Sequence, residues 1–268
     1  MLVLVLLVQL LGGGSKVIEI EVLKDVTLSG VPSNYTLSLV GKDKDETVVH
    51  VNSSVNNYES SGAIYGDNYA LKFKNVTVDF GSFANYKGFI RATELIFEDC
   101  NITGMGSYWG IGKVTFKNCV FKDYNEGKDS ATAGFENYFY NMWLYSGLNF
   151  MFEDCIFYSS NGKFINVYIE QVNDDIKVSM TRCSFIAGKD TGTGEVEKKT
   201  ALKVMKLGNW DINLTSCTTD QYVKDGTRTG SKLYNVLEED VSTNTKVTID
   251  GVVVWENGAK VETSATAQ

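Results

Sequence analysis

An eight-residue pattern of hydrophobic and polar positions returns several times along this chain. In LIFEDCNI, residues 95–102, the first and third positions are apolar, two polar residues follow, and a cysteine stands two positions before a further apolar residue. Apolar residues two positions apart are typical of a strand buried on one face, and the helical period is absent. The other copies lie at 71–78, 114–121, 150–157, 178–185, 212–219 and 247–254. Copies at irregular intervals predict a solenoid.

The fifth position of each copy predicts a sharp bend. Most of its residues tolerate left-handed backbone angles: Asn75, Asp99, Asn118, Asp154, Arg182, Ser216 and Gly251. The sixth position then points inward again, with Val76, Cys100, Cys119, Cys155, Cys183, Cys217 and Val252. Two short strands joined by a tight bend predict an all-β fold, a single-stranded right-handed parallel β-helix. Seven copies, with about two more coils before them, predict about nine coils.

The five cysteines fall at the same position of successive copies and so form one ladder inside the predicted solenoid. Free cysteine is among the most buried residue types, so we expect small apolar core residues. Disulfides between stacked coils are disfavoured, because in-register parallel neighbours do not readily bring Cβ atoms to about 3.8 Å. No two cysteines have the spacing of a zinc knuckle, and we predict no metal site.

The sequence divides into three segments. Residues 1–15 comprise an apolar run, MLVLVLLVQLL, and the sequence GGGS. This segment is a leader remnant, a foreign peptide with its linker, or a native cap over the first coil, and all three interpretations stay open. Residues 16–255 form the predicted β-helix, and residues 256–268 a C-terminal tail without apolar periodicity. The apolar run is too short to cross a bilayer as a helix, so we predict no membrane span.

The segment YTLSLVGKDKDETVVHVN, residues 35–52, shows an apolar strand, Leu-Val-Gly, a charged stretch and Thr-Val-Val. It resembles the early coil of pectinesterases and of other members of the pectin-lyase-like superfamily. That resemblance implies a right-handed parallel β-helix, in agreement with the repeat pattern. The catalytic motifs of the superfamily's pectinesterases, polygalacturonases and pectate lyases are absent here, apart from an isolated Asp174-Asp175. No catalytic residue is therefore assigned from the resemblance.

Composition argues against several classes of partner and of catalytic site. The net charge of −8 argues against nucleic acid or an anionic membrane as a partner. The single histidine, His50, lies between two inward valines and is expected to face outward, so a histidine-dependent nucleophile is excluded. Phosphate-binding glycine loops and HExxH are absent, and we predict no cofactor.

Two carboxylate pairs are candidate catalytic groups. Glu98-Asp99 and Glu153-Asp154 occupy the same register two coils apart, which is compatible with inverting glycoside hydrolysis. Lys117 occupies that register in the intervening coil. We therefore favour a surface charge ladder, Glu98–Lys117–Glu153, with each aspartate as a turn former.

Aromatic residues supply the candidate ligand surface, because sugar rings stack on tyrosine and tryptophan faces. They lie in and before a long insertion between copies: Tyr108, Trp109, Tyr138, Tyr140, Trp143 and Tyr145. The alternative interpretation is that these rings pack the insertion onto the solenoid.

The sequence thus favours a non-catalytic, adhesin-like, bacterial β-helix that is secreted or on the cell surface. It would act as a rigid scaffold that binds a glycan or a surface protein. One alternative is a divergent polysaccharide-active enzyme, a lyase or glycoside hydrolase that uses groove carboxylates. The second alternative is a structural subunit that self-associates end to end through residues 1–11.

Overall fold

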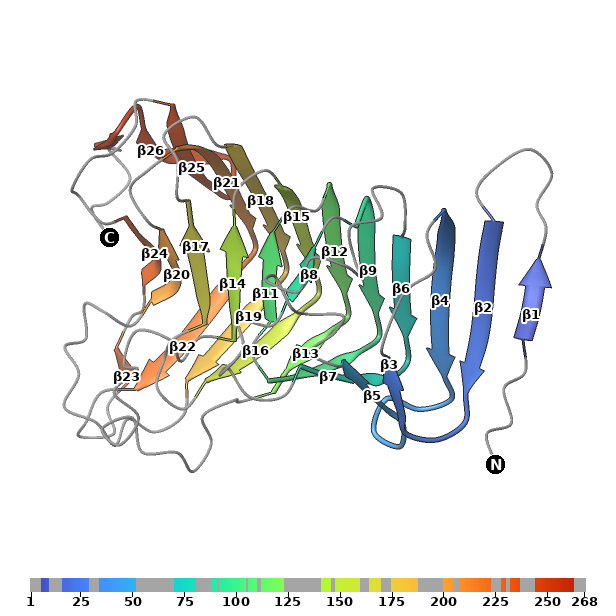
Figure 1. Ribbon diagram of the computed structural model, residues 1–268. Helices are drawn as coiled ribbons and strands as arrows, with labels where there is room; N and C mark the ends of the chain where they lie inside the picture. The colour runs from blue at the N-terminus through green and yellow to red at the C-terminus, as the bar shows by residue number, and fades with distance from the viewer. Residues whose placement is uncertain are drawn as a thin grey trace, which may run out of the picture.

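The computed structural model is built of strands (Figure 1). It describes residues 6–9, 16–28, 34–51, 70–80, 88–90, 92–104, 106–109, 112–122, 141–145, 148–159, 164–169, 175–187, 200–204, 208–222, 228–229, 232–236 and 244–262. These residues form three sheets and contain no helix, and so none that could cross a membrane.

The largest sheet, sheet A, has twelve strands. Nine of them run parallel, each paired with the next along the stack: β2 (Lys16–Val22), β4 (Tyr35–Gly41), β6 (Ala70–Lys74), β9 (Glu94–Glu98), β12 (Lys113–Lys117), β15 (Leu148–Glu153), β18 (Asp175–Thr181), β21 (Asn209–Thr215) and β25 (Thr245–Ile249). Three antiparallel strands complete it at its two ends: β1 (Leu6–Gln9), β26 (Val252–Glu256) and β27 (Ala259–Lys260).

Sheet B contains the short strands that follow the bends of the repeat. Its parallel strands are β3 (Val26–Leu28), β5 (Val48–Val51), β7 (Thr77–Asp79), β10 (Asn101–Thr103), β13 (Val120–Phe121), β16 (Ile156–Ser159), β19 (Ser184–Ala187) and β22 (Thr218–Tyr222). The strand β23 (Arg228–Thr229) pairs antiparallel with β22 and ends the sheet.

Sheet C lies in the intervals that the sequence pattern left as loops. Its six parallel strands are β8 (Gly88–Ile90), β11 (Gly106–Trp109), β14 (Met142–Tyr145), β17 (Ile165–Tyr168), β20 (Thr200–Val204) and β24 (Lys232–Val236). These strands are separated from the recurring pattern by stretches of variable length, so the repeat did not reveal them.

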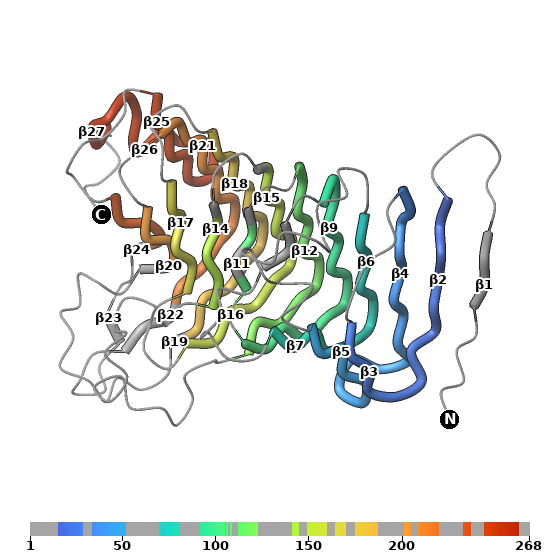
Figure 2. Tube along the Cα trace, viewed as in Figure 1, coloured from blue at the N-terminus to red at the C-terminus, as the bar shows by residue number. Residues whose placement is uncertain are grey.

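From β6 to β22 the chain visits the three sheets in a fixed order, A, then B, then C, before it returns to A. Each return adds a strand parallel to the last, and the stacked strands lie side by side along one direction (Figure 2). This arrangement of long parallel sheets is compatible with a parallel β-helix.

The predicted bends between sheets A and B are confirmed. Six of the seven bend residues have φ between 52° and 58°, in the left-handed region: Asn75, Asp99, Asn118, Asp154, Arg182 and Ser216. Backbone hydrogen bonds continue through the bend. For example, the N–H of Asp99 donates to the carbonyl of Lys117 over 2.9 Å. Each bend is therefore held by the bend of the next coil.

The seventh copy, residues 247–254, is where the sequence prediction was wrong. Asp250 and Gly251 both have positive φ, 48° and 80°, and together they turn the chain back on itself. The strand β26 then pairs antiparallel with β25, and Val252, predicted to point inward, is 46% exposed. An Asp-Gly pair between apolar strands is a strong hairpin signal, so this turn could have been predicted from the sequence.

The core consists of in-register ladders, as predicted. Phe73, Phe97, Phe116 and Phe152 stack in one column, with successive ring centroids 5.1, 4.6 and 5.0 Å apart. The cysteine column lies at the bend, with Cys100, Cys119, Cys155 and Cys183 fully buried and Cys217 half-buried. Thiols of this column contact backbone carbonyls of the preceding coil, as Cys119 Sγ does with Phe97 at 3.4 Å. The cysteines are small core side chains.

Candidate functional site

Tyr108, the first predicted aromatic ligand residue, lies inside the core. Its side chain is fully buried, and its ring meets those of Phe97 and Phe116 edge to face. Burial raises the pKa of the phenol well above its ordinary value. A ring in this position packs in the core between the sheets and is not available for stacking on a sugar.

The remaining predicted aromatic residues divide into three groups. Trp143 lies in β14, is 8% exposed and packs against Tyr168 with ring centroids 5.4 Å apart. Trp109 and Tyr145 lie in β11 and β14, but the structure does not describe their side chains. Tyr138 and Tyr140 lie outside the described residues. No described pair of these rings forms an exposed platform.

The predicted row of charges on the outer face of sheet A is confirmed in its register, and Lys117 Nζ lies 3.9 Å from Glu153 Oε2. Glu98, Lys117 and Glu153 are register partners in successive strands. Glu98 is held by Lys72 and Lys74 at 3.0 and 3.1 Å, and their hydrogen bonds keep the pKa of this carboxyl below its ordinary value. A general acid needs a raised pKa. Glu98 is therefore suited to an ion-pair role and not to acid catalysis.

His50 faces outward from sheet B, as the alternation predicted. Its side chain is 48% exposed, and Nδ1 lies 2.9 Å from Oδ2 of Asp79 in the next strand. Thr103 Oγ1 donates to the other oxygen of Asp79 over 3.1 Å. The short polar row of His50, Asp79 and Thr103 contains no nucleophilic pair with His50.

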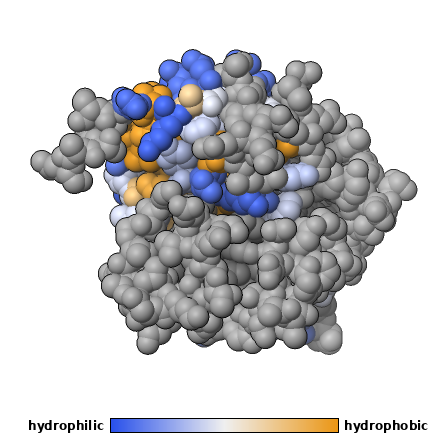
Figure 3. Space-filling view, turned by 90° about the vertical axis from the view of Figure 1, so that its left-hand side faces the viewer, coloured by the Kyte–Doolittle hydropathy of each residue, from blue (hydrophilic) through white to orange (hydrophobic). Residues whose placement is uncertain are grey.

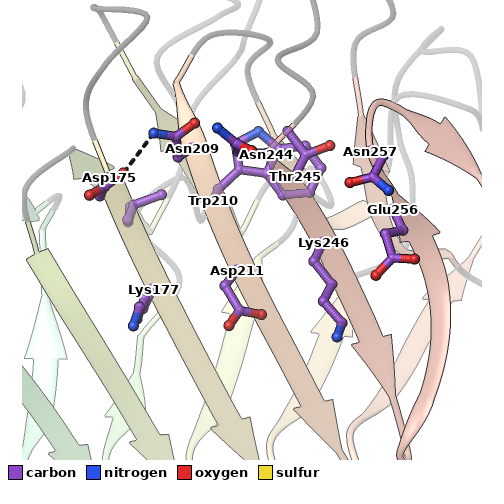
Figure 4. Close-up of a pocket in the computed structure, with 11 residues that line it drawn as sticks. Asp175, Lys177, Asn209, Trp210, Asp211, Asn244, Thr245, Lys246, Glu256 and Asn257 are labelled. Atoms are coloured by element: carbon purple, nitrogen blue, oxygen red, sulfur yellow. Dashed lines mark hydrogen bonds between the residues drawn. The ribbon is translucent and has the colours of Figure 1, made fainter.

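A pocket of about 330 Å³ lies near the C-terminal end of sheet A (Figure 4). Its lining comes from β18, β21, β25, β26 and adjoining residues, and comprises Asp175, Ile176, Lys177, Asn209, Trp210, Asp211, Asn244, Thr245, Lys246, Glu256 and Asn257. The pocket was not found from the sequence. Its residues come from distant stretches of the chain, which the parallel register of β18, β21 and β25 and the antiparallel pairing of β26 bring together.

Two outward rows form the polar wall of this pocket. In the first row, Lys177, Asp211 and Lys246 are register partners on three neighbouring strands, about 4.8 Å apart. In the second row, Asn209 Nδ2 donates to Asp175 Oδ1 over 2.8 Å. Figure 4 shows the first row below the second. The pocket therefore offers cationic donors, carboxylate acceptors and amides that can do both.

The charged side chains of the first row are unpaired. Among the described residues, the side chains of Lys177, Asp211 and Lys246 form no hydrogen bond or ion pair. By contrast, the charges nearer the middle of sheet A are paired, as in Arg182 with Glu153 at 2.7 Å and with Asp154 at 2.6 Å. The pocket therefore combines unpaired charged side chains with a concave lining.

The floor of the pocket is apolar. Trp210 occupies an inward position on β21 between Ile176 and Thr245 and is 2% exposed. Trp255 of β26 packs on it, with ring centroids 6.3 Å apart. The antiparallel turn at Asp250 and Gly251 places Trp255, Glu256 and Asn257 beside β25, with Trp255 buried and Glu256 exposed.

The pocket has the mixed chemistry of a small polar ligand site. Three carboxylates and two ammonium groups line it, so it has no strong excess of either charge. No group of three or more His, Cys, Asp or Glu side chains in the described part of the chain is arranged to hold a metal ion.

The comparisons with known proteins add no further assignment. No protein-family model matches the chain, and neither a curated protein nor a solved structure matches it.

Proposed function

We propose that this protein is a non-catalytic binding scaffold that holds a glycan in the pocket of sheet A. The observation that carries the proposal is the row of Lys177, Asp211 and Lys246, three charged side chains without partners beside a buried tryptophan floor. Sugar hydroxyls both donate and accept hydrogen bonds, so they match a wall of carboxylate, ammonium and amide groups. A volume of about 330 Å³ suits one or two sugar rings.

We propose that the scaffold is a right-handed parallel β-helix of about nine coils, similar to the pectin-lyase-like superfamily. The nine successive parallel strands of sheet A, from β2 to β25, support that number. A rigid stack of strands offers a long outer face on which a chain-like ligand can lie.

The scaffold would act outside the cell, secreted or on the cell surface, where glycans are accessible. Labelling of intact cells with an antibody, with and without protease treatment, tests this location. Signal only after cell lysis would contradict it.

The binding proposal is tested with an oligosaccharide panel and a matched pair of variants. Asp211→Ala should abolish glycan binding measured by isothermal titration calorimetry, because it removes the acceptor at the centre of the row. Glu94→Ala is the control. Glu94 lies in the same outward row as Asp211, joined to it through Lys113, Asn149 and Lys177, but outside the pocket. Equal binding by both variants would refute the assigned pocket.

The same panel separates a scaffold from an enzyme. A polysaccharide lyase or hydrolase would release unsaturated or shortened oligosaccharides, which mass spectrometry of the supernatant detects. Bound but unchanged glycan supports the scaffold. New products that persist in Glu98→Gln would direct attention to the pocket carboxylates instead.

A second candidate function, end-to-end assembly, is favoured by the position of β1. This apolar strand pairs antiparallel with β2 and forms the N-terminal edge of sheet A. An edge strand presents backbone groups to which another chain can pair. Assembly through residues 1–11 predicts oligomers in size-exclusion chromatography that disappear when residues 1–15 are deleted. A monomer in both cases would exclude it.

A further inference from the structure

Trp210, which lines the pocket, and the neighbouring Trp255 differ in one hydrogen bond. The indole Nε1 of Trp255 donates to Oγ1 of Thr245 over 3.0 Å. The indole Nε1 of Trp210 is buried, and among the described residues it has no acceptor. A buried N–H without an acceptor is costly, and native structures rarely contain one without a reason.

The position of Trp210 places this N–H at the pocket. Its side chain lines the cavity, and Figure 4 shows it beside Asn244 and Thr245, at the level of Asn209. Asn244 is exposed at the rim. Asn244 and Trp210 both line the pocket, so a ligand bound there lies next to the Trp210 ring.

The missing partner is a strong acceptor. The first row, Lys177, Asp211 and Lys246, already offers ammonium and carboxylate groups that can form hydrogen bonds with sugar hydroxyls. The indole N–H of Trp210 needs an oxygen that only accepts hydrogen bonds, such as a carbonyl oxygen. A hydroxyl in that place would bring a further donor that itself needs a partner. The pocket as a whole has nearly balanced charge, which disfavours a polyanionic chain.

We propose that the pocket is specific for an N-acetylated amino sugar, whose acetamido carbonyl accepts a hydrogen bond from the indole N–H of Trp210. This inference rests on the proposed glycan-binding function and adds the class of sugar. Sites with a buried donor discriminate strongly against ligands that cannot satisfy it, because the donor is then left unpaired. The acetamido group is thus the feature by which this pocket recognises its ligand.

The test compares two oligosaccharides of equal length and linkage, chitotetraose and cellotetraose, which differ only in the acetamido or hydroxyl group at C2. The wild-type protein should bind chitotetraose at least about tenfold more tightly. Trp210→Phe keeps an apolar ring and removes the N–H, so the preference should fall below about twofold. The melting temperature of this variant should fall less than the smaller ring alone would imply, because the loss of an unsatisfied buried donor partly offsets the cavity.

Trp255→Phe is the matched control. It removes the neighbouring indole N–H, which is already satisfied, and should preserve the preference for chitotetraose. Equal affinity of the wild-type protein for both oligosaccharides, or an unchanged preference in Trp210→Phe, would overturn the inference and leave glycan binding intact. Absence of binding to every glycan of a broad panel would instead remove the proposed function itself.

Discussion

The guanidinium of Arg182 holds the carboxylate of Asp154 through two hydrogen bonds, Nε to Oδ1 at 2.6 Å and NH2 to Oδ2 at 2.8 Å. Both residues occupy the bend of their coil, with φ of 53° and 54°. The same guanidinium also reaches Glu153 at 2.7 Å. Arginine has no special tolerance for left-handed backbone angles. At this bend, its guanidinium holds the preceding bend through Asp154 and Glu153.

This clamp predicts a pH dependence. The hydrogen bond from Arg182 lowers the pKa of Asp154 below its ordinary value of about 3.9. The folded-state pKa is thus below the unfolded one, so the stabilisation is complete above about pH 4 and is lost as the pH falls through the folded value. Asp154→Asn should lower the melting temperature by at most about 2–4 °C at pH 7, because the pair is exposed.

As the pH falls through the folded-state pKa of Asp154, the melting temperatures of Asp154→Asn and wild type should converge. Thermal melts followed by circular dichroism between pH 2.5 and 7 check this. A difference that grows on acidification would contradict the assigned clamp.

The buried cysteine column predicts unreactive thiols. Cys100, Cys119, Cys155 and Cys183 are fully buried, so a reagent in solution has no access to their thiols. Native protein should react with Ellman's reagent at no more than one thiol, that of the half-buried Cys217, and should titrate all five after denaturation. Rapid reaction of Cys119 in the native state, located by mass spectrometry, would show that the column is open to solvent.

The phenylalanine stack predicts a large cost of truncation at its centre. Phe116 is fully buried between Phe97 and Phe152, so Phe116→Ala should destabilise the fold by about 3–5 kcal/mol. Phe116→Leu fills more of the space and should cost clearly less. Urea denaturation followed by circular dichroism measures both. Similar losses in the two variants would mean that stacking, and not cavity formation, dominates at this site.

The turn at Gly251 predicts a backbone effect separate from packing. Gly251 has φ of 80°, and a Cβ placed there would meet no atom within 4 Å. Gly251→Ala should therefore cost about 1 kcal/mol through strain alone, and Gly251→Asn clearly less, because asparagine tolerates positive φ. Denaturation followed by tryptophan fluorescence reports on Trp210 and Trp255 at the same time. Equal stability of both variants would show that the hairpin does not need this angle.

The C-terminal end of the molecule is where the sequence pattern and the fold diverge. Figure 3 shows apolar and hydrophilic residues side by side on this end. The pattern of residues 247–254 satisfies the repeat by its apolar positions, but the Asp250-Gly251 pair makes a hairpin instead of a bend. The local backbone preference of two residues overrides the hydrophobic pattern of eight, because a two-residue turn with positive φ at both positions reverses the chain.

The pocket could not be predicted from the sequence. Lys177, Asp211 and Lys246 are about 35 residues apart in sequence. No local motif marks them, and each by itself is an ordinary outward strand residue. Only the register of β18, β21 and β25 makes them neighbours. The aromatic residues were a clearer sequence signal, but composition does not distinguish a ring on the surface from one in the core, as Tyr108 shows.

The sequence by itself determined the parallel all-strand stack, the positions of the left-handed bends and the buried column of cysteines. These follow from period-two alternation and from residues that tolerate positive φ, which are local properties of the chain. The tertiary structure decided the existence of sheet C, the antiparallel ends of sheet A and the pocket beside Trp210. Those features depend on which strands pair with one another. That pairing is determined by packing and hydrogen bonding between residues distant in the sequence.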